Sequence, residues 1–152
     1  MDVHSLGGLL KRVGNYDMSS LQGRIIFQKT VYLLQAFGLY LGYKFSWYVY
    51  GPYSTQLARN GFELIEIYDE VPEMGFVEEG NEKVFLKFLL FLGERKNDSN
   101  WLEALASIHF LKKLYHGESK ERIINKVMDK QPYFNKEICE EAWSYLELFG
   151  LI

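Results

Sequence analysis

With 152 residues, 48% of them hydrophobic, the chain can bury one substantial core and is short for two, so we expect a single domain over residues 1–152. The net charge of −3 is uneven: residues 1–60 carry six Lys and Arg against two acids, net +4, and the rest carries eleven against eighteen, net −7. A single cysteine, Cys139, excludes an intramolecular disulfide, and no apolar stretch approaches the length of a membrane span, so we expect a cytoplasmic protein that is not in a membrane.

Two helices are predicted in the first forty residues. Asp2 or Ser5 can cap a short helix whose apolar residues between 6 and 13 share one face. Ser19 or Ser20 can cap a longer one from about Leu21 to Phe37 with a broad apolar surface.

A polar row follows another face of the second helix at spacings of four, four and three: Arg24, Gln28, Tyr32 and Gln35. Such a row is usually a solvated side of a helix. Gln and Tyr in place of Glu and Lys make it less charged than a typical solvent face, which leaves room for a hydrogen-bonding surface.

A strand, a rigid turn and a helix start follow within twelve residues, from Lys44 to Thr55. The residues from Phe45 to Tyr50 all suit a pleated surface and alternate between two faces of a strand. Gly51-Pro52 is expected to end this strand, and Ser54 to cap a helix that runs to about Asp69. The sequence therefore predicts a strand-turn-helix corner with exposed tyrosines.

Residues 75–86 predict a hairpin of two short strands about the tight turn Gly80-Asn81. The alternative is a helix that begins at Glu82 and runs through Phe85 to Arg95. With the hairpin, residues 1–95 have the order of a winged-helix-like unit: helix, helix, strand, helix, wing.

Residues 96–152 are predicted to be wholly helical. Trp101 begins one helix that closes at His116-Gly117, Ser119 caps the next, and Asn135 caps the last. The expected fold class is mainly α (α+β), with about six or seven helices and a small antiparallel sheet made of residues 45–50 and the 75–86 hairpin.

No residue pattern typical of an enzyme is present, and we expect no catalytic residues, no cofactor and no metal. His109 and His116 are seven residues apart on one helix, but Lys112 and Lys113 lie between them and disfavour a cation site. Acidic neighbours of Cys139 would raise the pKa of its thiol and suppress the thiolate. A Gly-rich phosphate loop, a nucleophile elbow and a zinc-ligand pattern are all missing.

Nucleic acid is a possible partner that the charge disfavours. The helix that would enter the DNA groove, from Thr55 to Asp69, carries one Arg. This helix and the residue just after it carry four acids: Glu63, Glu66, Asp69 and Glu70. The candidate wing has three Glu against one Lys. These charges would repel phosphates, so we expect a non-enzymatic protein-interaction module, with a winged-helix nucleic-acid-binding transcriptional regulator as the alternative.

Two segments resemble a known family. They are Arg24-Ile-Ile-Phe-Gln-Lys-Thr-Val-Tyr-Leu-Leu-Gln35 and Phe45-Ser-Trp-Tyr-Val-Tyr-Gly-Pro-Tyr-Ser54. A helix with Gln-Lys-x-x-Tyr-x-x-Gln before an aromatic strand that ends in Tyr-Gly-Pro is similar to the YwgA-like family of bacterial and archaeal proteins. More distantly it resembles SocA-type antitoxins with a Panacea domain. The resemblance covers roughly residues 20 to 70 and implies a helical binding module, antitoxin-like or regulatory, whose partner is a protein such as a toxin.

The predicted binding site combines the polar row with the corner: Arg24, Gln28, Tyr32, Gln35, Trp47, Tyr50, Tyr53 and Ser54. A short connection between the two elements should bring guanidinium, amide and phenol groups together. Such a composition is typical of an interaction hot spot. The alternative is that Trp47 belongs to the core, the polar row is solvated, and the tyrosines only brace the turn.

Overall fold

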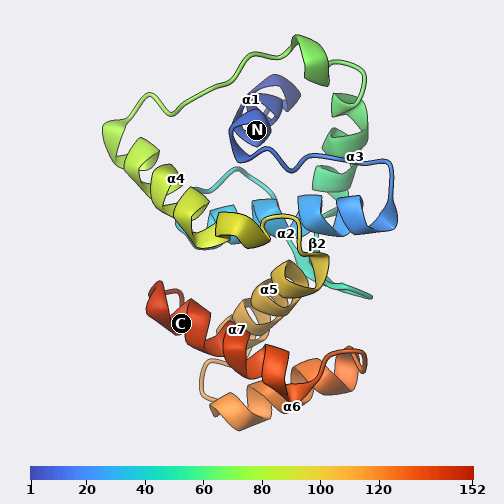
Figure 1. Cartoon of the computed structure of the whole chain (residues 1–152), viewed down its shortest axis with the longest axis vertical. Coiled ribbons are helices and arrows are strands. Elements are labelled where there is room, and N and C mark those ends of the chain that lie inside the picture. Colours follow the sequence, from blue (N-terminus) through green and yellow to red (C-terminus); the bar gives the residue numbers. More distant parts are fainter.

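The computed structural model describes residues 1–152 and contains seven α-helices and one two-stranded antiparallel sheet, which confirms the mainly α fold class (Figure 1). The helices are α1 (Val3–Val13), α2 (Leu21–Ala36), α3 (Thr55–Leu64), α4 (Glu79–Leu92), α5 (Ser99–Leu114), α6 (Lys120–Lys130) and α7 (Lys136–Leu148). The strands are β1 (Ser46–Tyr48) and β2 (Gly51–Tyr53), and two single 3-10 turns are η1 (Tyr68–Glu70) and η2 (Gly93–Arg95). None of the helices is long and apolar enough to cross a membrane.

Polar side chains begin the helices where the sequence predicted them. Five of these side chains accept a hydrogen bond from the backbone N–H three residues further on: Asp2, Ser20, Ser54, Ser119 and Asn135. The first-turn N–H groups of a helix have no partner within it, so a capping oxygen stabilises each of these starts by about 1 kcal/mol.

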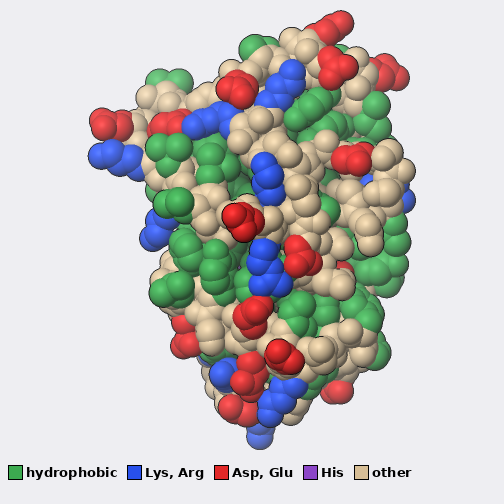
Figure 2. All heavy atoms as spheres, viewed as in Figure 1, with side chains coloured by type: hydrophobic (Ala, Val, Ile, Leu, Met, Phe, Trp, Pro, Cys, Tyr) green, Lys and Arg blue, Asp and Glu red, His purple; other side chains and the backbone are tan.

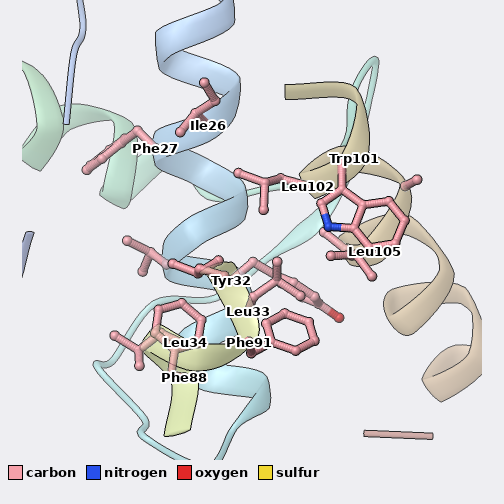
Figure 3. Packing of buried hydrophobic residues seen from close by; sticks show 14 of the residues in the cluster. Ile26, Phe27, Tyr32, Leu33, Leu34, Phe88, Phe91, Trp101, Leu102 and Leu105 are labelled. Carbon is pink, nitrogen blue, oxygen red and sulfur yellow. The ribbon is translucent and has the colours of Figure 1, made fainter. Parts of the chain in front are cut away.

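Helix α2 lies at the centre of the molecule, and ten of its sixteen residues are buried. Phe27 of α2 points toward α3 (Figure 3). Around the rest of α2 pack two residues of α4, Phe88 and Phe91, and two of α5, Leu102 and Leu105. A helix covered on so many sides has little solvent face. Its polar side chains must therefore find partners inside the protein.

The sheet is a hairpin formed within the predicted corner, with Trp47 opposite Pro52 and Tyr48 opposite Gly51. The expectation that Gly51-Pro52 ends the strand is wrong, because these two residues begin β2. Both strands of a two-stranded sheet are edges, and an edge strand tolerates a proline that has no N–H to donate. Gly51 takes a φ of +89°, which other residues rarely adopt.

The predicted hairpin over residues 75–86 is also wrong, because α4 begins at Glu79 and takes Gly80 and its neighbour into its first turn. The alternative helix is the correct one, although it starts three residues before Glu82. Burial favours the helix, because Phe85, Phe88 and Leu92 are buried at the three- and four-residue spacing of one helix face. The sheet therefore stands before α3, and no strand follows α3 in the position of a wing.

Helix α5 joins the two halves of the chain, since it packs against α2 on one side and against α6 and α7 on the other. One cluster of 36 buried hydrophobic residues includes members of all seven helices. Cys139 is completely buried in it, and burial raises the pKa of its thiol to about 11.

Candidate functional site

Gln28 on α2 holds the start of α3 through both ends of its side-chain amide. Its Nε2 donates to the carbonyl oxygen of Ser54 at 2.9 Å, and its Oε1 accepts from the N–H of Ser54, also at 2.9 Å. Both residues are buried. The amide thus pairs with a main-chain N–H and C=O as a neighbouring strand would.

Gln35, two turns further along α2, does the same for the segment that leads into β1. Its Oε1 accepts from the N–H groups of Leu41 and Tyr43 at 2.9 and 3.1 Å, and its Nε2 donates to the carbonyl of Tyr43 at 3.0 Å. The two glutamines of the polar row are therefore not solvated side chains, because they are bound to the backbone of the segment from residue 41 to residue 54.

Lys29 belongs to the same set of contacts, although sequence reasoning missed it. Its side chain is 1% exposed, and its Nζ donates to the carbonyl oxygen of Pro52 at 2.7 Å. Burial disfavours the charged ammonium and lowers its pKa to about 8, and the nearby charge of Glu103 offsets part of that effect. A signal was available, since Lys29 lies between Phe27 and Val31 on a helix rich in apolar residues.

A buried polar cluster lies behind the hairpin, in α5 and the segment after α6. Gln131 Nε2 donates to Glu103 Oε2 at 2.6 Å and to Ser107 Oγ at 3.0 Å, and the Tyr133 hydroxyl donates to the same Glu103 oxygen. Burial raises the pKa of Glu103, and the two hydrogen bonds oppose this. A lone acid in the apolar run from residue 101 to residue 108 was the signal in the sequence.

A pocket of about 300 Å³ opens between α2, the β1–β2 hairpin and α3, and we call it the hairpin pocket. Its wall is mostly apolar, and four of its large apolar residues are 47 to 73% exposed: Leu21, Tyr48, Val49 and Phe62. Hydrophobic side chains gather along the right margin of the molecule in Figure 2, at the height where Figure 1 places the tip of the hairpin.

Only two charged residues line the hairpin pocket, Arg24 and Lys29, and both are cationic. Arg24 forms no ion pair; its guanidinium donates to the carbonyl oxygen of Met18 at 3.2 Å. The pocket therefore joins an apolar wall to positive charge that no acid of the protein pairs directly.

The structure divides the eight predicted site residues between different places. Four line the hairpin pocket: Arg24, Gln28, Tyr50 and Tyr53. Tyr32 and Gln35 line a second pocket on another side of α2, and Ser54 is buried at the start of α3. Trp47 is half-buried, with its ring 5.9 Å from that of Phe110 and the Lys130 ammonium 5.6 Å from its centre.

Replacing Gln28 by Ala should lower the free energy of unfolding by about 2 kcal/mol, because two hydrogen bonds are lost and the buried N–H of Ser54 is left without a partner. The Ser54 carbonyl keeps its hydrogen bond from the N–H of Ala58. Urea unfolding followed by circular dichroism measures the change. Gln56→Ala, on the exposed side of α3, is the matched control and should change stability by less than about 0.5 kcal/mol. Equal stability of the two variants would show that the Gln28 contacts contribute nothing.

No protein-family model, no curated protein and no solved structure matches this chain. The resemblance to YwgA-like and Panacea proteins therefore stays a prediction that rests on the residues of α2 and the corner.

Proposed function

We propose that this protein is a non-enzymatic protein-interaction module, antitoxin-like or regulatory, and that its hairpin pocket receives a segment of a partner protein. The segment would insert a large apolar side chain into the pocket and place an Asp or Glu beside it. The observation that carries this proposal is the pairing of an apolar pocket with two cations and no acid in its wall.

Large apolar side chains in the wall of the hairpin pocket are exposed to solvent. Val49 at the tip of the hairpin is 73% exposed and Phe62 on α3 is 51% exposed, although both line one pocket. Isolated exposed apolar residues are common, but several around one concave site are typical of a surface that is covered by a partner. Tyr48 adds an aromatic ring that lies 4.9 Å from that of Tyr53, so the rim offers large contact area at low conformational cost.

The two cations of the hairpin pocket, Arg24 and Lys29, favour an acidic residue in the partner. A guanidinium forms paired hydrogen bonds with a carboxylate, and these are stronger than bonds between neutral groups. Lys29 is held by Pro52 inside the protein and adds positive potential rather than a direct contact. A partner segment with an acid next to its apolar anchor would pair with Arg24 and would be attracted by the positive potential of Lys29.

Selection from a library of displayed random peptides tests the proposal without a known partner. Enriched peptides should carry a Phe, Trp, Leu or Met adjacent to an Asp or Glu. A synthetic peptide with the selected sequence should bind the Arg24→Gln variant about tenfold less tightly than the parent protein. It should bind the Val49→Asp variant more than tenfold less tightly, as expected for hot-spot contacts. Fluorescence anisotropy measures the affinities.

Two surface variants serve as controls, because they lie on α4, which contributes nothing to the hairpin pocket. Lys87→Gln removes the same charge as Arg24→Gln, and Leu90→Asp places an acid at an apolar residue that is 75% exposed. Both should bind the peptide as the parent does. Peptides without acids, or equal losses in all four variants, would refute the proposed mode of binding, and a dimer disrupted by Val49→Asp would identify a second copy as the occupant.

A further inference from the structure

A second pocket, of about 420 Å³, lies between the end of α2, the segment that leads into β1, and the end of α5, and we call it the loop pocket. It shares no residue with the hairpin pocket. Its volume falls in the range of small-molecule sites. The function proposed above makes no use of it.

A tyrosine and a histidine in the wall of the loop pocket are joined by a hydrogen bond. The Tyr32 hydroxyl lies 2.7 Å from His109 Nδ1. Burial, together with the charge of Lys113, lowers the pKa of His109 to about 4, so the ring is neutral at pH 7. Burial raises the pKa of Tyr32, which therefore keeps its proton.

The protons of this pair follow from the available partners. The phenol has no other acceptor, so it donates to Nδ1, and the hydrogen of the neutral imidazole is then on Nε2. Nε2 donates to no atom of the protein. The loop pocket thus contains an imidazole N–H that is free to bind a ligand.

Lys113 supplies the charge of the loop pocket. It lies on the exposed side of α5 and forms neither an ion pair nor a hydrogen bond. No Asp or Glu lines the pocket. An anion placed there would meet an ammonium and an N–H donor with no opposing carboxylate in the wall.

The remaining wall is rich in aromatic rings: Tyr40, Tyr43, Phe45 and Phe110. Tyr40 is 70% exposed, so its ring is free to cover a ligand, whereas Tyr43 is fixed by a hydrogen bond from its hydroxyl to Asn60 at 2.9 Å. Aromatic walls of this kind favour flat rings, which stack on them or pack edge to face.

We propose that the loop pocket binds a small aromatic anion, that is, a planar ring that carries a carboxylate or a phosphate. The ring packs among the aromatic side chains, and the anionic group meets Lys113 and the Nε2–H of His109. This is a ligand site separate from the protein-binding surface, and either can exist without the other.

Titrations with four probes test the site: phenylacetate, phenyl phosphate, benzyl alcohol and inorganic phosphate. The two aromatic anions should bind saturably at about 1 mM or below, and the neutral ring and the free phosphate at least about tenfold more weakly. In two-dimensional NMR spectra, the shifts of Ala36, Phe110 and Leu114 should move while that of Phe62 in the hairpin pocket stays in place. The stronger of the two aromatic anions identifies the preferred anionic group.

Lys113→Gln should weaken binding of the aromatic anions about tenfold, because one charge-assisted contact is lost. The control Lys87→Gln changes the net charge equally at an exposed position of α4 and should leave binding unchanged. Either side chain is on the surface, so both variants should fold normally. The proposal is wrong if no probe binds, if the neutral ring binds as well as the anions, if the two lysine variants behave alike, or if the shifts move at the hairpin pocket.

Discussion

Gly51→Ala should lower the free energy of unfolding by about 4 kcal/mol, the largest loss we expect from a single added methyl group in the hairpin. Two costs combine. The φ of +89° is unfavourable for any residue with a Cβ, at about 1 to 2 kcal/mol. A Cβ on Gly51 would also lie 2.4 Å from Ser107 Oγ, and overpacking a dense interior costs about 1 to 3 kcal/mol more.

Gly80→Ala is the matched control for this prediction. A Cβ on Gly80 would meet nothing within 4 Å, its φ is not positive, and it lies in the first turn of α4. This substitution should therefore leave stability unchanged or raise it by up to about 1 kcal/mol. Chemical unfolding of both variants measures the difference. A Gly51 variant as stable as the Gly80 variant would contradict the close packing of the hairpin on α5.

Lys29 should make the protein more stable as the pH rises from about 8 to about 10.5. The pKa of this lysine is about 8 in the folded chain and is expected near its ordinary value of 10.5 in the unfolded chain. Between these values the unfolded state binds more protons, so the free energy of unfolding increases with pH. The gain over this window should be about 3 kcal/mol relative to a variant that lacks the ammonium.

The comparison uses Lys29→Met, which keeps an unbranched side chain and cannot be charged. Urea unfolding of both proteins at several pH values gives the two curves, and titrating tyrosines contribute equally to each. The difference between the curves should be flat below about pH 8 and should rise above it. The control Lys87→Met changes an exposed position, and its curve of stability against pH should run parallel to that of the parent protein. If the difference in stability between the parent and Lys29→Met is the same at every pH, the Lys29 ammonium is not desolvated.

Local signals predicted most of the helices because they are contained within a few residues. A capping side chain such as Asn135 satisfies the first-turn N–H groups wherever the segment lies in the fold. The hairpin over residues 75–86 failed for the opposite reason. Gly80-Asn81 suits a tight turn but is also tolerated in the first turn of α4, and the burial of Phe85 and Phe88 against distant parts of the chain decides between them.

The candidate site was harder to predict, because its polar groups are paired over long distances in the sequence. Gln28 meets Ser54 26 residues away, and the residue type of Gln28 alone cannot tell a buried clamp from a solvated side chain. Lys29 and Glu103 were missed, since lysine and glutamate in helices are nearly always exposed. The four residues that do line the hairpin pocket were predicted from composition and short connections, which place residues near one another but do not define a cavity.

Side chains of α2 form hydrogen bonds with the main chain of the corner and not with its side chains, so the sequence of the corner can change without loss of these contacts. Gln28, Lys29 and Gln35 contact main-chain carbonyl or N–H groups. Every residue offers the carbonyl, and every residue except proline offers the N–H. Substitutions at Val49 and Tyr48, whose side chains make none of these bonds, can change the contact surface while the frame stays in place. The hairpin tip is therefore a position at which selection, or an engineer, can exchange the recognition residues without rebuilding the fold beneath them.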